Sequence, residues 1–137
     1  MTSGVIACDS SLLVAAHLAF HPRHGEALDV VEARVQAAPA HVLLECYSVL
    51  TRLPAPHRID EKTASESLAG LDLDLLALPA KRHLAVIRGL SAAGIRGGAV
   101  YDGLVAATVR HHGGVLLTLD RRARATYDAV GVPYEVL

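Results

Sequence analysis

The chain has 137 residues, of which 52% are apolar, 20% charged and 4% aromatic. This length and apolar content suit one domain that folds without disulfides or a structural metal, so we expect a single domain over residues 1–137. The net charge of −1, from 13 Lys and Arg against 14 Asp and Glu, excludes a strongly basic nucleic-acid binder. It leaves open an enzyme whose acidic residues hold a metal ion.

Strands and helices alternate along the chain. The expected strands are short apolar runs, and the expected helices carry apolar residues at helical spacing. In chain order we expect a strand over 5–8, helices over 10–20 and 26–37, a strand over 41–44, helices over 45–53 and 60–71, a strand over 73–78, helices over 81–93 and 101–112, a strand over 115–119, a helix over 121–130 and an edge strand over 132–137. Such alternation predicts an α/β fold with helices on both faces of a mainly parallel sheet.

No apolar run approaches the ~20 residues that span a bilayer, and the first residues lack the basic and apolar regions of a signal peptide. The two cysteines, Cys8 and Cys46, lie in apolar runs and form no C-x-x-C pair. Buried, reduced thiols are the simplest interpretation. We therefore expect a cytoplasmic protein that does not associate with a membrane.

Four acidic residues stand at the ends of predicted strands or the starts of predicted helices. Asp9 and Asp120 follow strands directly, while Glu45 and Asp102 open helices. Taken singly, each is also explained as a helix N-cap or a first-turn acid. The carboxyl ends of parallel strands share one edge of the sheet, so we expect the four carboxylates to converge there. Such a cluster takes up protons or binds a cation, and oxygen ligands favour Mg²⁺ or Mn²⁺.

The segments around these acids resemble the PIN domain, and more closely the VapC-type toxin ribonucleases of bacterial toxin–antitoxin pairs. The resemblance is carried by residues 7–13 (ACDSSLL), the pair Leu44–Glu45, residues 101–107 (YDGLVAA) and residues 116–120 (LLTLD). It spans the whole chain. It implies that residues 1–137 form one PIN domain, a three-layer α/β/α sandwich around a mainly parallel sheet.

The resemblance also implies the chemistry. It assigns catalysis to Asp9, Glu45, Asp102 and Asp120. Of these, Asp9, Asp102 and Asp120 would hold Mg²⁺, with Mn²⁺ as a substitute, and Ser10 and Thr118 would support the acids from a second layer. The implied activity is that of an endoribonuclease toxin, which hydrolyses phosphodiester bonds in RNA and leaves 5′-phosphate and 3′-hydroxyl ends.

Basic and aromatic residues near the acids are candidates for contact with a nucleic acid. Arg121 and Arg122 follow Asp120 directly, and Arg96 precedes a glycine pair. A guanidinium pairs well with phosphate, although a solvated helix face is the plainer alternative. Tyr101 and Tyr47 adjoin site acids, so both are candidates for stacking on bases, with half-buried packing as their alternative.

The resemblance implies partners as well. A toxic nuclease must be held silent, so we expect a cognate VapB-like antitoxin along the helices over 10–20 and 40–53, and a homodimer within a toxin–antitoxin hetero-oligomer. Two other functions remain open. A catalytically silent interaction module would keep the fold, but the intact set of acids disfavours it. A metal-dependent phosphatase would need a D-x-D motif, whereas serines follow Asp9.

Overall fold

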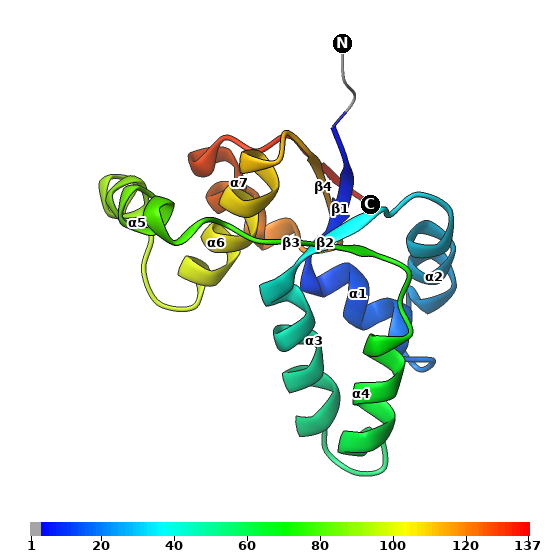
Figure 1. Cartoon of the computed structure of the whole chain (residues 1–137). Helices are drawn as coiled ribbons and strands as arrows, with labels where there is room; N and C mark the ends of the chain where they lie inside the picture. Colours follow the sequence, from blue (N-terminus) through cyan, green and yellow to red (C-terminus); the bar gives the residue numbers. More distant parts are fainter. Residues whose placement is uncertain (1–3) are drawn as a thin grey trace.

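The structure is a computed structural model that describes residues 4–137 (Figure 1). Residues 1–3, which belong to the expected domain and to the segment in which no signal peptide is predicted, lie outside the described residues. The strands are β1 (Ile6–Cys8), β2 (Ala37–Pro39), β3 (Asp74–Leu76), β4 (Val115–Thr118) and β5 (Tyr134–Val136). The helices are α1 (Ser10–His17), α2 (His24–Ala33), α3 (Ala40–Arg52), α4 (Glu61–Ala69), α5 (His83–Ala92), α6 (Ala99–His111) and α7 (Arg124–Val130). Short 3₁₀ turns, Ala80–Arg82 and Arg121–Ala123, precede α5 and α7.

The five strands form one sheet in the order β3-β2-β1-β4-β5, and every pairing is parallel. The predicted α/β class and parallel sheet are therefore confirmed, and β5 is an edge strand as expected. The chain starts at the central strand β1 and adds β2 and then β3 toward one edge. It then returns to the centre, where β4 pairs with the other side of β1, and β5 forms the opposite edge. The direction of winding reverses between β1 and β4, the position at which open parallel sheets place their binding sites.

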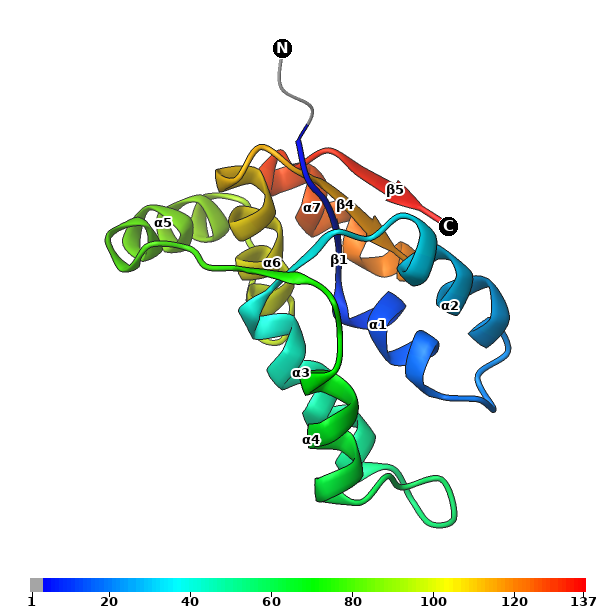
Figure 2. The ribbon, with the colours of Figure 1, turned by 45° about the vertical axis from the view of Figure 1, so that its right-hand side comes forward.

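Helices cover both faces of the sheet. In Figure 1, α5, α6 and α7 lie to the left of the strands and α1 and α2 to the right, while α3 and α4 form an antiparallel pair below them. The view in Figure 2 places α7 behind β4 and α2 on the opposite side, which agrees with the predicted α/β/α layering. Among residues 4–137, no helix combines the length and apolar character needed to cross a bilayer.

The predicted strand over 41–44 is wrong, because these residues belong to α3. The strand lies earlier, at Ala37–Pro39, where the prediction placed the end of a helix. Pro39 has an extended backbone and directly precedes the helix, which begins at Ala40. Val42 is buried on the same face of α3 as Cys46 and Leu50, at a spacing of four residues that suits a helix. Small alanines form the strand, so no β-branched run marked it in the sequence.

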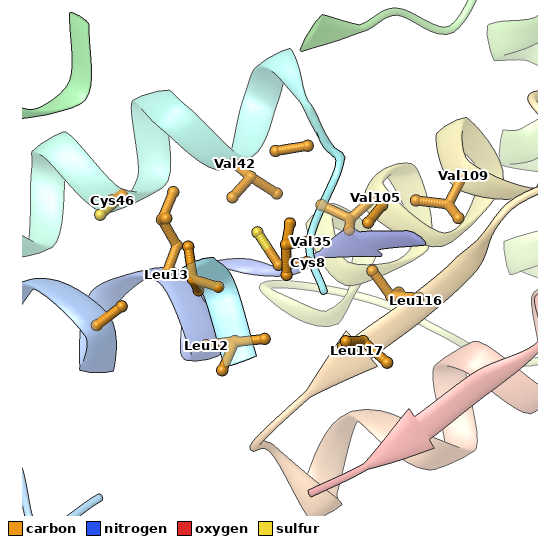
Figure 3. Close-up of a cluster of buried hydrophobic side chains, with 14 of the residues drawn as sticks. Cys8, Leu12, Leu13, Val35, Val42, Cys46, Val105, Val109, Leu116 and Leu117 are labelled. Carbon is orange, nitrogen blue, oxygen red and sulfur yellow. The ribbon is translucent and has the colours of Figure 1, made fainter. Parts of the chain in front are cut away.

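The core lies between the central strands and the helices on either face. Figure 3 shows Cys8 of β1 among Leu13 of α1, Val42 of α3 and Val105 of α6. Both cysteines are free and buried. Burial raises the pKa of the Cys46 thiol to about 12 and also raises the pKa of Cys8, so both thiols stay protonated at neutral pH. They act as small apolar side chains.

Gly103 allows α5 to pack closely against α6. A Cβ added at this position would lie 2.6 Å from Cδ2 and 3.2 Å from Cδ1 of Leu90, which is itself buried. A glycine inside a helix costs ~1 kcal/mol relative to alanine. The glycine is needed because the side chain of Leu90 occupies the space that an alanine methyl group would fill.

We therefore predict that Gly103→Ala does not stabilise the protein. The gain of ~1 kcal/mol in helix propensity is opposed by overpacking, which typically costs about 1–3 kcal/mol. In the Leu90→Ala background the obstruction is gone, and the same substitution should stabilise by roughly 1 kcal/mol. Urea unfolding of the four proteins measures this double-mutant cycle. Equal stabilisation by Gly103→Ala in both backgrounds would contradict the packing explanation.

Candidate active site

Asp9 stands at the junction between β1 and α1, at the centre of the sheet. It is the N-cap of α1, and its Oδ1 accepts a hydrogen bond from the backbone N–H of Leu12 at 3.2 Å. Its own backbone N–H donates to the carbonyl oxygen of Leu117 in β4, also at 3.2 Å. The end of β1 is thus tied to the end of β4, where the winding of the sheet reverses.

The carboxylate of Asp9 is surrounded by hydroxyl donors. The hydroxyl of Ser11 donates to Oδ1 at 2.6 Å, while Oδ2 accepts from the hydroxyls of Thr118 and, at 2.7 Å, Tyr127. Asp9 is only 4% exposed. Burial raises the pKa of its carboxyl, and the hydrogen bonds from these hydroxyls and the Leu12 backbone oppose that rise. The donors hold the carboxylate in one orientation.

Asp120 begins the 3₁₀ turn that follows β4. Its Oδ1 accepts from the backbone N–H of Arg122 at 2.9 Å, and its own N–H donates to Thr118 Oγ1 at 2.9 Å. The Ser11 hydroxyl oxygen accepts the backbone N–H of Leu119 at 3.0 Å. Thr118 and Ser11 therefore connect the segment that carries Asp120 to the carboxylate of Asp9.

Glu45 and Asp102 bring the other two carboxylates, from α3 and α6. Burial, followed by the charges of Asp102 and Asp9, raises the pKa of Glu45 to about 7. Burial, followed by the charges of Asp120 and Asp9, raises the pKa of Asp102 to about 6. These effects require the acids to lie near one another, so the structure brings the predicted quartet into one neighbourhood. Glu45 Oε1 is buried and has no hydrogen-bond partner within the described part of the chain.

The side chains do not converge on a single metal position as they stand. Within residues 4–137, no group of three His, Cys, Asp or Glu side chains is arranged to hold an ion. The oxygen donors Asp9, Asp102 and Asp120 suit Mg²⁺ or Mn²⁺ chemically, so the metal site stays a prediction. Binding would require side chains such as Asp102 to turn toward a common point.

Two predicted supporting residues have different outcomes. Thr118 donates a hydrogen bond to Asp9, and Ser11 rather than Ser10 makes the serine hydrogen bond to Asp9. In the first turn of a helix the N-cap side chain faces the residues two and three positions later, which explains the offset. Ser10 instead lines a hollow beside Asp120.

The predicted arginines lie at varying distances from the acids. Arg122 Nε is 3.7 Å from Asp120 Oδ1, although the Arg122 side chain is 96% exposed. Arg122 lines the same hollow of about 380 Å³ as Ser10 and Asp120. Arg96 and Arg121 are exposed, and neither forms an ion pair with the acids in the described residues. Only Arg122 is thus placed at the site.

Sequence reasoning missed two residues that the structure places near the acids. Tyr127 of α7 is fully buried and reaches Asp9 from more than a hundred positions away along the chain. His41 of α3 lies with Nε2 3.7 Å from Glu45 Oε1. No local motif marks either residue, although the spacing of four residues between His41 and Glu45 is the one that faces side chains on a helix.

This chain is similar in sequence to known proteins along nearly its whole length. The sequence profile of the PIN domain matches residues 6–129. Ribonuclease VapC40 of Mycobacterium tuberculosis is 39% identical over 134 residues, which cover 97% of this chain and 99% of the relative. Ribonuclease VapC27 of the same species is 35% identical over 127 residues, or 93% of each chain.

Solved structures share the fold. FitAcB from Neisseria gonorrhoeae superposes with a TM-score of 0.65 at 18% identity, covering 95% of this chain and 96% of that one. PAE2754 from Pyrobaculum aerophilum gives a TM-score of 0.62 at 23% identity, covering 96% and 83%. The chain therefore belongs to the PIN domain family. Its curated relatives place it among PIN domains of the VapC type.

We predict that the metal-free protein loses stability as pH rises through neutrality. The raised pKa values of Glu45 and Asp102 mean that the folded state holds protons more tightly than the unfolded chain. The stability from these protons is full below pH ~4 and is lost as pH rises through about 6 to 7. In chelator, thermal melts at pH 5 and pH 8 should differ less for Glu45→Gln than for wild type. An equal pH dependence in both proteins would contradict the assignment.

A second prediction concerns the hydrogen bond between Tyr127 and Asp9. Tyr127→Phe should cost about 1–2 kcal/mol, because it removes a donor from a buried carboxylate. In the Asp9→Asn background the same change should cost less, since the charge that strengthens the bond is gone. Denaturant unfolding of the two single variants and the double variant measures the coupling. Additive costs would show that the two side chains do not interact.

Proposed function

We propose that this chain is a metal-dependent endoribonuclease and the toxin of a type II toxin–antitoxin pair. The observation that carries the proposal is the gathering of Asp9, Glu45, Asp102 and Asp120 at the carboxyl edge of the sheet, where burial and then neighbouring carboxylates raise the pKa values of Glu45 and Asp102. The resemblance to Mycobacterium tuberculosis ribonucleases along nearly the whole chain supports the same activity.

In this proposal Asp9, Asp102 and Asp120 hold Mg²⁺, for which Mn²⁺ can substitute. The bound ion would polarise a phosphoryl oxygen and lower the pKa of a water molecule. Asp9 is already oriented by four hydrogen bonds, so one of its oxygens would exchange a hydroxyl partner for the ion on binding. Asp102 and Asp120 can adjust, since both are only partly buried.

Glu45 would accept a proton from the attacking water. Its pKa of about 7 lies close to the pH at which a cytoplasmic enzyme works, which is the best value for a proton acceptor. Its Oε1 is buried and has no hydrogen-bond partner in the described residues, so it keeps an unused acceptor for a water that reaches the site. The water oxygen would form a bond to phosphorus as the bond from phosphorus to the 3′ oxygen breaks. The 3′ oxygen would take a proton from solvent, which leaves 5′-phosphate and 3′-hydroxyl ends.

Arg122 is the best placed of the basic candidates to bind substrate. It lines the hollow next to Asp120, together with the hydroxyl-bearing Ser10 and Ser11. We propose that it pairs with a backbone phosphate beside the bond that is cut. Arg121 and Arg96 are exposed and would add long-range attraction for RNA.

We further propose a VapB-like antitoxin as the partner. The hollow beside Asp120 takes Val14 from α1 and Val49 from α3, the two helices expected to wall the antitoxin groove. An apolar segment would cover these valines and direct a basic side chain at the acids. Apolar side chains on the surface, such as Leu84 and Ile87 of α5, support a homodimer within the hetero-oligomer.

Metal-dependent cleavage of RNA tests the proposed activity. The purified wild type should cut total RNA in Mg²⁺ or Mn²⁺ and stop in excess chelator. Asp102→Asn should lower the rate at least ~100-fold, because it removes a ligand charge. Asp29→Asn, an exposed carboxylate on α2, is the matched control and should cut like wild type.

Two results would refute the activity. Cleavage that persists in chelator would remove the metal from the mechanism. A wild type that binds the antitoxin but cuts no RNA under any metal would favour the silent interaction module, in which Asp9 and Asp120 serve only as caps of the turns that follow them. Co-expression with the product of the neighbouring gene should relieve growth arrest if that product is the antitoxin.

A further inference from the structure

An aromatic pair connects the two helices that bring Glu45 and Asp102 to the site. The rings of His41 in α3 and Tyr101 in α6 have centroids 5.3 Å apart and planes that differ by 11°, so they are stacked. His41 lies one helical turn before Glu45, and Tyr101 directly precedes Asp102. The pair therefore stands at the acidic cluster itself.

The tyrosine ring remains accessible despite this stacking. Tyr101 is 53% exposed, whereas His41 is partly buried and lies beside Glu45. Because the histidine covers one face of the tyrosine ring, the accessible surface is the opposite face and the edge. The histidine holds the ring in place, so a ligand that stacks on it loses little conformational freedom of the protein.

We propose that Tyr101, backed by His41, stacks on a nucleobase of the RNA strand next to the bond that is cut. The inference rests on the proposed ribonuclease function and adds a binding site for a base to the acids and arginines that act on the backbone. Unpaired bases of RNA are commonly held by aromatic rings, and every base offers a flat face to such a ring. Tyr101 directly precedes Asp102 and stacks on His41 beside Glu45, so its ring borders the path of an RNA strand cut at these acids.

The test measures binding of a ten-nucleotide, single-stranded RNA pool of random sequence by fluorescence anisotropy, with Ca²⁺ replacing Mg²⁺. Tyr101→Leu should weaken binding roughly 5- to 100-fold, the range expected for loss of one base–ring stack. Tyr101→Phe keeps the ring and should restore most of the binding. The salt dependence of binding should stay as in wild type for Tyr101→Leu and become shallower for Arg122→Gln, which removes a phosphate contact.

Phe20 provides a matched control. It is 50% exposed and packs against His57 with ring centroids 4.1 Å apart, but the pair lies beyond the C-terminal ends of α1 and α3. Phe20→Leu should bind RNA like wild type. His41→Ala should weaken RNA binding less than Tyr101→Leu, and His41→Phe should restore it, because His41 acts by positioning Tyr101.

The outcomes separate this inference from the proposed function. Wild-type binding by Tyr101→Leu, in a protein whose wild type cuts RNA in Mg²⁺, overturns the stacking site and leaves the ribonuclease intact. A wild type that neither binds the pool nor cuts RNA overturns both. Loss of the oligomeric state in Tyr101→Leu, measured by sedimentation, with RNA binding unchanged, would identify the ring as a protein interface instead.

Discussion

The site depends on the hydrogen bonds that the buried carboxylate of Asp9 accepts. This carboxylate caps α1, lies beside the end of β4 and accepts hydroxyl hydrogen bonds from Ser11, Thr118 and Tyr127. A carboxylate so deeply buried is costly unless its oxygens are satisfied. The four donors meet that cost, and in doing so they join two central strands to a helix on either side of the sheet.

The remaining acids follow a different principle. Glu45 and Asp102 are only partly buried, and neighbouring carboxylates contribute to the rise of both pKa values. The edge of the sheet thus combines one carboxylate that is fixed by hydrogen bonds with others that are held close against their mutual repulsion. That repulsion weakens the fold, and in the function that we propose a bound cation would relieve it.

Much of this arrangement was predictable from the sequence, for reasons that lie in local structure. Asp9 and Asp120 follow apolar runs that form central strands, and their place at the sheet edge follows from topology alone. The strand at Ala37–Pro39 was not predictable, because its alanines resemble a helix and only pairing with β1 and β3 makes it a strand. Tyr127 was equally hidden, since long-range packing alone brings α7 to Asp9.

Asp9 has a structural role in the fold and a proposed role in catalysis, and the two together limit which substitutions can be accepted during evolution. Substitution at Asp9 changes a helix cap, a strand junction and the partner of a buried phenol at once, so such a variant loses hydrogen bonds along with its charge. Glu45 has no hydrogen bond to forfeit in the described residues, and Asp102 is half-buried at the start of α6. A lineage that discards the chemistry but keeps the scaffold would therefore lose Glu45 or Asp102 first, and an aspartate at position 9 would outlast the activity it once served.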